Sequence, residues 1–220
     1  MNSPLLQLLV LAGIAIFLIL RLKSVLGTRD GFEGPPSGRR APATPTPRQE
    51  FEVIEGGPDH DIIDHVAEGS EAAKALAEMK RAEPSFVVGE FLGGAKQAYE
   101  WILMSFERGQ MDEMAPFLSE DVFEAFSQVV DARQEKGLTI EAEFVGVRET
   151  SLVDAKFDDM TRKGEITVRF VGELISVVKD ADGETIEGKP GSPKKQKDVW
   201  TFERELGADD PNWRLVATGE

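Results

Sequence analysis

The sequence predicts an α+β fold, with helices packed on a curved antiparallel sheet, preceded by one transmembrane helix. Residues 85–135 carry apolar side chains at helical spacing, and from Leu138 onwards the apolar period changes to two. Helices followed by consecutive strands are typical of α+β domains. In addition, residues 1–20 carry no charged side chain, which indicates a segment that inserts into a membrane.

Residues 1–24 are expected to anchor the chain in a membrane. A helix over residues 5–22 would be ~27 Å long at ~1.5 Å per residue, close to the ~30 Å thickness of a hydrocarbon core. Basic residues follow this run and none precedes it, which favours a cytoplasmic position for the rest of the chain. We therefore expect a single uncleaved span. A cleaved signal peptide and a helix lying on the membrane surface are the alternatives.

Residues 25–58 are expected to form a disordered linker. Proline and glycine recur throughout this segment and few apolar residues interrupt them, so little burial would offset the entropy of ordering it. A flexible chain of this length has an r.m.s. reach of ~30 Å. The domain that follows could therefore move over the membrane surface.

Residues 59–83 are expected to form an acidic accessory helix in front of the domain at residues 84–220. Asp59 is a plausible N-cap, and Asp61 suits the first turn. The apolar stripe is thin, and a Gly-Ser pair at residues 69–70 interrupts it. This pattern predicts a helix that is loosely attached to the domain.

The strongest helix is expected at residues 85–108, after Pro84. Its apolar residues recur at alternating spacings of four and three, and Gly109 is placed to end it in a left-handed conformation. A short turn at residues 112–118 leads to Ser119, which is placed to cap a helix over residues 120–135. The expected buried stripe of the first helix is Phe91, Ala95, Ala98, Ile102 and either Ser105 or Phe106.

Strands are expected at residues 138–146, 166–178, 199–206 and 212–218, with weaker alternation at residues 151–157. In the second of these, Ile166, Val168, Phe170 and Leu174 fall on one face, and residues 182–197 are expected to be a loop. Gly146 and Gly172 lie inside strands, where glycine often marks a bend or a bulge. The sheet is therefore expected to be strongly curved.

Charge and composition exclude several functions. The net charge is −15, and residues 1–58 hold six of the 25 basic and five of the 40 acidic residues, so residues 59–220 hold 19 basic and 35 acidic residues and carry a net charge of −16. An acidic domain does not attract the phosphate backbone, and we expect no nucleic-acid partner. The absence of cysteine excludes thiol catalysis, disulfides and Cys-ligated metals.

No enzyme activity, cofactor or metal is expected. His60 and His65 are the only histidines, and a spacing of five does not place two side chains on one helix face. Gly93 and Gly94 follow no strand, so they are not a phosphate-binding loop. Strand carboxylates could serve in acid–base chemistry, but their alternation points them away from the Phe-bearing face. These are Glu141, Glu143, Glu173 and Glu203.

Several runs resemble the Tim44-like domain, the C-terminal domain of the subunit that tethers the import motor to the mitochondrial inner-membrane translocase. They cover roughly residues 84–220, and Gln110 stands where the family commonly has an acidic residue. With its N-terminal span, Pro-rich linker and lack of cysteine, the chain is similar to bacterial members, of alphaproteobacterial type. The runs are FLGGAKQAYEWI at 91–102, FERG at 106–109, MAPFL at 114–118, SEDVFEAF at 119–126 and PNWRL at 211–215.

The resemblance implies a cone-shaped, nuclear-transport-factor-2-like fold. Together with the expected span, it favours a membrane-tethered binding or scaffold module at the cell inner membrane, with its C-terminal domain in the cytoplasm. Expected partners are membrane proteins or unfolded protein segments, in a role linked to membrane protein transport or assembly, and the lipid bilayer through the N-terminal helix. The alternatives are a binder of lipid or another small hydrophobic ligand through the cone, and an acid–base enzyme.

Four residues of the main helix are the candidates for ligand or partner binding. Phe91 and Tyr99 belong to a set of aromatic residues, some of which could line the mouth of the cone. The others are Trp101, Phe106, Phe123, Phe126, Phe144, Phe170, Trp200, Phe202 and Trp213. Gly93 and Gly94 each weaken a helix by ~1 kcal/mol relative to alanine. An adjacent pair on the buried side of the helix would indicate close backbone approach or room for a ligand.

Overall fold

The computed structural model describes residues 59–219, and their arrangement confirms the α+β prediction. The predicted span at residues 1–24 and the predicted linker at residues 25–58 lie outside the described part. None of the helices within residues 59–219 combines the length and the apolarity needed to cross a membrane. The elements in chain order are α2 (His60–Ile63), α3 (Glu71–Ala82), α4 (Val88–Arg108), α5 (Met111–Met114), η1 (Ala115–Phe117), α6 (Glu120–Glu135), β1 (Thr139–Asp158), β2 (Lys163–Lys179), β3 (Thr185–Gly188), β4 (Lys194–Glu205) and β5 (Arg214–Gly219).

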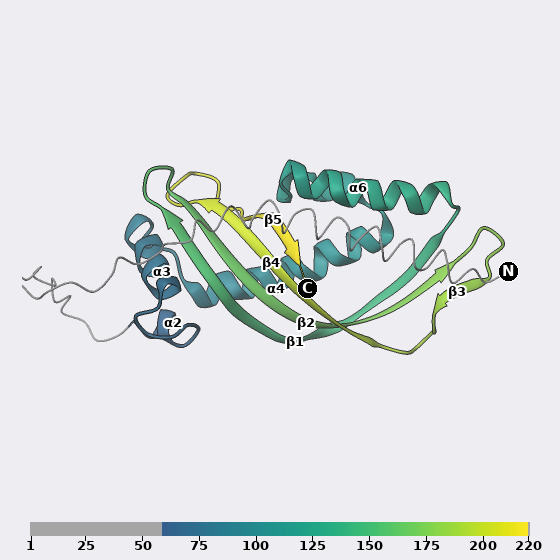
Figure 1. Ribbon diagram of the computed structural model, residues 1–220, viewed down its shortest axis with the longest axis horizontal. Coiled ribbons are helices and arrows are strands. Elements are labelled where there is room, and N and C mark those ends of the chain that lie inside the picture. The colour runs from purple at the N-terminus through teal and green to yellow at the C-terminus, as the bar shows by residue number, and fades with distance from the viewer. Residues whose placement is uncertain (1–58, 220) are drawn as a thin grey trace, which may run out of the picture. The chain divides into compact units, whose positions relative to one another are not determined.

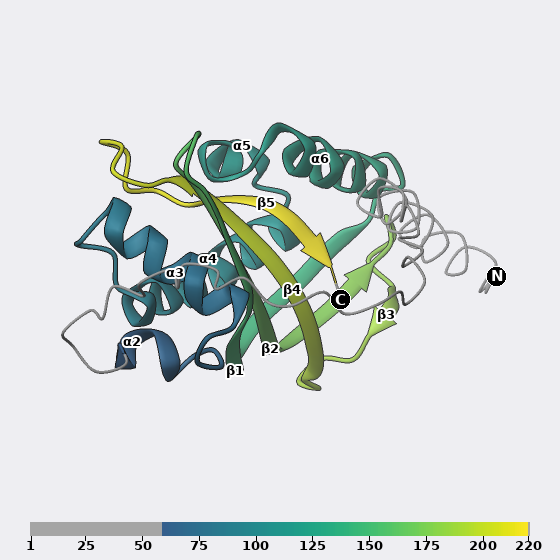
Figure 2. The ribbon, with the colours of Figure 1, turned by 60° about the vertical axis from the view of Figure 1, so that its left-hand side comes forward.

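The sheet has five antiparallel strands in the order β1-β2-β4-β5, and β3 pairs with the C-terminal end of β2. The strands curve strongly, and α4 and α6 lie on the concave side (Figures 1 and 2). Two details differ from the expectation. The two segments expected at residues 138–146 and 151–157 are one continuous strand, β1, and the expected loop at 182–197 contains β3.

The two glycines inside the strands have different structural roles. The pairing of β1 with β2 shifts register at three places, one of them between Phe144 and Gly146, where Gly146 has φ of 152°. The bulge predicted at Gly146 is therefore present. At Gly172 the pairing of β2 with β4 continues without a shift. A Cβ atom there would lie 2.9 Å from the Tyr99 hydroxyl, so this glycine makes room for a helix side chain.

Helix α4 fills the centre of the core as its apolar period predicts. The predicted face of β2, formed by Ile166, Val168, Phe170 and Leu174, is buried against it. Gly109 ends the helix in the left-handed conformation with φ of 71°, and the backbone N–H of Gln110 donates to the carbonyl of Ser105 at 2.8 Å, as in a Schellman cap. Ser119 caps α6 as predicted, accepting from the N–H of Val122.

Residues 59–83 form two helices, α2 and α3, and the expectation that this segment is loosely attached is wrong. Leu76 and Met79 have no exposed surface. Asp61 accepts hydrogen bonds from the backbone N–H groups of Val88 and Gly89 at 2.8 and 2.9 Å, and so caps α4 from another helix. The apolar stripe is thin, but each of its central residues falls into the shared core.

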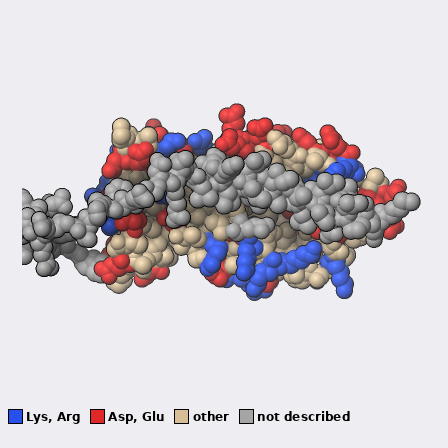
Figure 3. Space-filling view, viewed as in Figure 1, with Lys and Arg blue, Asp and Glu red and all other residues tan. Residues whose placement is uncertain are grey.

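Acidic and basic side chains are unevenly distributed over the surface. Acidic side chains gather over α6, and Lys and Arg side chains form a band on the opposite side of the molecule (Figure 3). Helix α6 carries five exposed acidic residues, Glu120, Asp121, Glu124, Asp131 and Glu135. On the convex face of the sheet, Arg148 pairs with Glu173 and Arg169 pairs with Glu149. The basic band is thus partly neutralised by its own neighbours.

Candidate functional site

An open apolar hollow of about 270 Å³ lies between α4, η1, β4 and the segment that leads into β5. Aromatic rings make most of its wall, and the amide of Gln97 is the single polar side chain among the residues that line it. The lining residues are Gln97, Ala98, Trp101, Ile102, Phe117, Phe202 and Trp213. The hollow can therefore accept an apolar group and offers it few hydrogen-bonding partners.

The outer wall of the hollow comes from α4 and η1. Trp101 is 38% exposed, and its ring meets that of Phe117 edge to face with centroids 5.2 Å apart. The one-turn helix η1 is fixed by the residues after it, since the N–H of Ser119 donates to the carbonyl of Leu215 at 2.9 Å. An exposed tryptophan whose ring is backed by a supported turn is the kind of residue that dominates binding energy at protein interfaces.

The inner wall comes from Trp213 and Phe202, and two further rings support it from behind. The ring of Trp213 lies 4.7 Å from that of Phe91 and 5.9 Å from that of Phe86. Phe91 also meets Phe202 edge to face at 6.1 Å. These distances are typical of favourable aromatic pairs, so the inner wall rests on a packed aromatic cluster.

None of the four candidate residues predicted from the sequence lines the hollow. Phe91 is 7% exposed and lies one layer behind the wall, which contradicts its expected place at a mouth. Gly93 and Gly94 are exposed, and a Cβ on either would meet no atom within 4 Å, so the idea of close approach on a buried side is wrong. Tyr99 is fully buried and faces the sheet. The structure brings Phe91 near the site and leaves the other three away from it.

The buried hydroxyl group of Tyr99 has a carboxylate as its hydrogen-bond acceptor. Its ring stacks on that of Phe170 with centroids 4.4 Å apart, and its hydroxyl donates to Asp198 Oδ2 at 2.5 Å. Burial, followed by the hydrogen bond and the charge of Asp198, raises the pKa of Tyr99 above its usual value of 10.0. The hydroxyl therefore keeps its proton, and the pair is structural.

A second polar contact lies between α4, α6 and β2. The Glu107 carboxylate accepts from the Ser176 hydroxyl at 3.4 Å, and burial raises the pKa of Glu107 while the charge of Arg133 opposes that effect. The guanidinium of Arg133 lies 4.5 Å from the ring centre of Phe106. The hollow borders none of these residues, so this cluster does not supply an acid or a base to it.

Three of the four strand carboxylates considered for acid–base chemistry form ion pairs at or near the surface. Glu173 pairs with Arg148, Glu203 pairs with Lys163, and Glu141 pairs with Lys179. His60 lies beside Asp64 at 3.8 Å. Within residues 59–219, no three His, Cys, Asp or Glu side chains gather closely enough to hold a metal ion.

The sequence carried a partial signal for the hollow. Trp101, Phe202 and Trp213 are among the many aromatic residues of the domain that could line a mouth, and all three do line the hollow. Phe117 was not among the expected residues. Trp101 falls outside the apolar stripe of its amphipathic helix, which distinguishes it from the aromatic residues of the core. A large aromatic residue at such an exposed position was the signal that could have identified it as part of a site.

The chain was compared with known protein families, curated proteins and solved structures. The family model described as the Tim44-like domain matches residues 72–220, and this match begins inside α3. Among solved structures, the intermembrane space region of the chloroplast protein ARC6 matches 56% of this chain and 94% of that chain. The TM-score is 0.36 and the identity 7%, a likeness too low to support any conclusion.

Curated relatives are subunits of mitochondrial import machinery. The chain is 23% identical over 151 residues to the probable mitochondrial import inner membrane translocase subunit tin-44 of Caenorhabditis elegans, covering 67% of this chain and 35% of the relative. It is 23% identical over 161 residues to subunit TIM44-1 of Arabidopsis thaliana, covering 70% and 34%. It is 21% identical over 159 residues to TIM44 of Homo sapiens, covering 71% and 35%.

The chain spans about a third of the length of these relatives, so the similarity concerns one domain of larger proteins. They come from animals and a plant, and the bacterial, alphaproteobacterial type expected from the sequence stays a prediction. The α+β arrangement is consistent with the nuclear-transport-factor-2-like fold expected for this domain. Since the family match covers residues 72–220, the chain belongs to the Tim44-like domain family.

Proposed function

We propose that the chain is a membrane-tethered binding module whose hollow receives an apolar segment of a protein partner. The observation that carries this proposal is the apolar hollow itself, with the exposed Trp101 at its outer wall. The partner would be a membrane protein or an unfolded protein segment during transport or assembly. The names of the curated relatives support a link to protein translocation, and residues 1–24 would supply the tether at an inner membrane.

The volume of the hollow favours a protein side chain over a whole lipid. Pockets for drug-sized ligands enclose ~300–1,000 Å³, and the hollow encloses about 270 Å³. One or two apolar side chains of a partner segment would fill it. The alternative of a lipid or another small hydrophobic ligand rests on the same apolar lining, and it would require the hollow to widen.

A catalytic function has less support. The hollow is lined by six apolar side chains and one amide, and neither type transfers a proton near neutral pH. The relatives are named as translocase subunits. We therefore favour binding without chemistry.

Site-specific crosslinking in intact membranes tests the proposal. A photoreactive phenylalanine analogue in place of Gln97 would lie at the rim of the hollow, where we expect it to capture discrete protein partners. Trp101→Ala should reduce that capture by about tenfold, as for a central aromatic residue at an interface. Glu100→Ala, at the neighbouring exposed position of α4, is the matched control and should leave it unchanged. Unchanged capture in Trp101→Ala would reject the hollow as the binding site.

A further inference from the structure

A charged side chain holds the inner wall of the hollow from behind. The guanidinium carbon of Arg204 lies 5.3 Å from the ring centre of Trp213, within the ~6 Å range of a cation–π contact. Its Nη1 donates to the carbonyl of Pro211 at 3.1 Å, two residues before Trp213. Arg204 therefore contacts both the ring of Trp213 and the backbone that carries it.

Arg204 is itself held by Glu83. Its Nη2 donates to Glu83 Oε2, and the two side chains are only 10% and 19% exposed. Among the described residues, Arg204 Nε is buried without a hydrogen-bond partner, so the guanidinium depends on Glu83 and on the Pro211 carbonyl. A buried charge that loses its partner is strongly destabilised where it lies. Without Glu83, Arg204 would be driven towards solvent.

Glu83 belongs to a different part of the domain from the hollow. It is the C-cap residue of α3, and its Oε2 also accepts from the backbone N–H of Gly207 at 2.7 Å. Close by, Arg162 donates from Nη2 to the carbonyl of Ala82 at 2.8 Å and from Nε to the carbonyl of Leu206 at 2.9 Å. The end of α3 is thus attached to the β1–β2 and β4–β5 turns.

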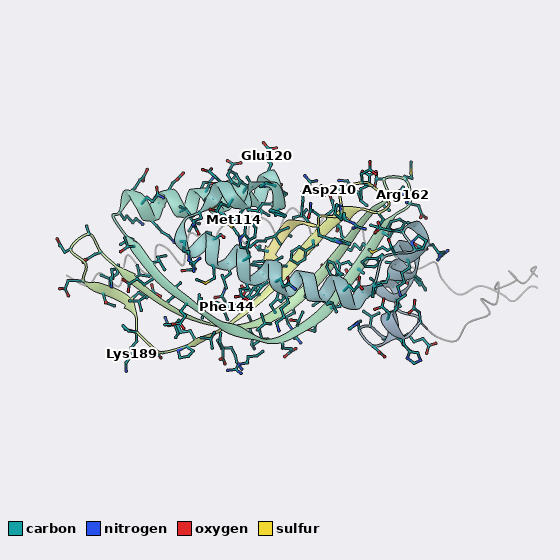
Figure 4. The ribbon with its side chains drawn as sticks, turned by 180° about the vertical axis from the view of Figure 1, so that it is seen from behind. Met114, Glu120, Phe144, Arg162, Lys189 and Asp210 are labelled. Carbon is teal, nitrogen blue, oxygen red and sulfur yellow. The ribbon has the colours of Figure 1, made fainter. Side chains whose placement is uncertain are left out.

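The same end of the sheet carries both turns. Arg162 and Asp210 lie together there, and Lys189 lies at the opposite end (Figure 4). Arg162 has φ of 56°, a left-handed conformation that is unfavourable for a non-glycine residue. Its two hydrogen bonds to carbonyl groups offset that strain, so the attachment of α3 is a specific feature of this end of the fold.

We propose that Glu83 and Arg204 are positioning residues for the hollow, through which the docking of α3 sets the orientation of Trp213. This inference rests on the proposed function only in taking the hollow as the binding site. When α3 is docked, Arg204 covers one side of Trp213 and the inner wall is fixed. When the contact of Glu83 with Arg204 is lost, Arg204 leaves and Trp213 gains alternative rotamers, so the hollow loses its shape.

The consequence is a form of regulation. Glu83 is the C-cap residue of α3, so a shift of this end of the helix changes the hollow without touching it. Energetic coupling of this kind between two sites is typically worth five- to 150-fold in affinity. We expect about fivefold, because a single ion pair transmits the effect.

Fluorine NMR of the full chain in lipid nanodiscs, labelled with 5-fluorotryptophan, tests the positioning directly. The three tryptophans give three signals, and Trp213→Phe assigns one of them. Glu83→Gln should shift or split the Trp213 signal and leave that of buried Trp200 in place. Glu78→Gln, which removes another α3 carboxylate, paired with Arg81 on the surface, is the control and should leave all three signals unchanged.

Two further measurements separate positioning from simple destabilisation. Arg204→Lys keeps the charge but loses the flat guanidinium, so it should move the Trp213 signal while the melting temperature stays close to that of the parent chain. Crosslinking from position 97 should fall about fivefold in Glu83→Gln, and Glu83→Asp should recover part of it.

The two proposals can fail separately. A Trp213 signal at its parent position in folded Glu83→Gln and Arg204→Lys would overturn the positioning role, whatever the crosslinking shows. A shifted signal with crosslinking unchanged in both Glu83→Gln and Trp101→Ala would leave the positioning intact and reject the hollow as the partner site. If Glu83→Gln does not fold, Arg204→Lys alone decides the first question.

Discussion

The Tyr99 hydroxyl donates a 2.5 Å hydrogen bond to Asp198 Oδ2 and so joins the middle of α4 to β4. The phenol ring passes over Gly172 of β2, where a Cβ atom would come within 2.9 Å of its oxygen and 3.2 Å of its Cε1. One glycine therefore allows the helix to approach the sheet. This contact fixes the position of α4, and α4 supplies four residues of the hollow.

Gly172→Ala should destabilise the domain by about 1–3 kcal/mol, as expected when a packed core receives an extra methyl group. Tyr99→Phe removes the nearest atom, so the alanine should be less harmful in that background. The loss of the hydroxyl should itself lower stability by about 1–3 kcal/mol, because Asp198 loses a buried donor. Chemical denaturation of the single and double variants measures the coupling. Strictly additive effects would contradict the contact.

Phe91→Ala and Trp101→Ala should separate stability from binding. Phe91 is 7% exposed within an aromatic cluster, so its truncation should lower the unfolding free energy by about 3–5 kcal/mol. Trp101 is 38% exposed and its truncation should lower it by only about 1 kcal/mol while partner capture falls. Thermal melts and crosslinking on the same samples check both. If Phe91→Ala hardly changed the unfolding free energy but reduced crosslinking to the partner, Phe91 would instead line the mouth of a binding site.

Removal of residues 59–83 should prevent cooperative folding of the domain. The deletion exposes core surface that Leu76 and Met79 cover and removes the Asp61 cap from α4. Leu76→Ala alone should lower stability by about 2–5 kcal/mol. Lys74→Ala, at an exposed position of the same helix, is the control. A chain beginning at residue 84 that melts as sharply as one beginning at residue 59 would show that the segment is only accessory.

Acid should loosen the α2–α3 segment first. Burial acts to raise the pKa of Asp61, but the hydrogen bonds from Lys80, Gly89 and Val88 outweigh it and hold the pKa below 3.8. At Glu83 burial is likewise outweighed, by Gly207 and Arg204, and the pKa lies below 4.5. A carboxyl group with a lowered pKa stabilises the fold fully above its unfolded-state pKa, and that stabilisation is lost as the pH falls through the folded-state pKa.

The pH window therefore begins near 4.5 and extends below 3.8. Asp61→Asn and Glu83→Gln should each flatten the fall in melting temperature on acidification. Asp131→Asn, at an exposed position of α6, should leave the slope of that fall unchanged. Glu107 acts in the opposite direction, because burial raises its pKa and protonation favours the fold. If the melting temperature fell equally steeply with acid in all variants, Asp61 and Glu83 would not be the groups responsible.

Residues 1–24 should hold the chain in the membrane through washing with alkaline carbonate. The prediction rests on the uncharged run at residues 1–20 and on the basic residues that follow it. Protease added to the cytoplasmic side should release the domain by cutting within residues 25–58. Recovery of the full-length chain in the carbonate supernatant would contradict the span, and cleavage only from the opposite side would reverse the topology.

The local elements of the described domain follow from the order of its residues. The spacing of Phe91, Ala95 and Ile102 identifies the buried stripe of α4, and Gly109 and Ser119 mark where helices end and begin. Alternation along residues 166–174 identifies the face of β2 that meets them. These features depend on backbone geometry that repeats every few residues, so neighbouring side chains are enough to predict them.

The position of the site depends on contacts between residues far apart in the chain. Gly93 and Gly94 occupy the exposed side of α4, and Phe91 supports the hollow without lining it. The hollow joins residues of α4, η1, β4 and the segment before β5, and Glu83 reaches Arg204 across 121 positions of the chain. Such contacts depend on how a bulged, curved sheet aligns distant elements. Periodicity carries no information about that alignment, because many registers would bury the same apolar stripes equally well.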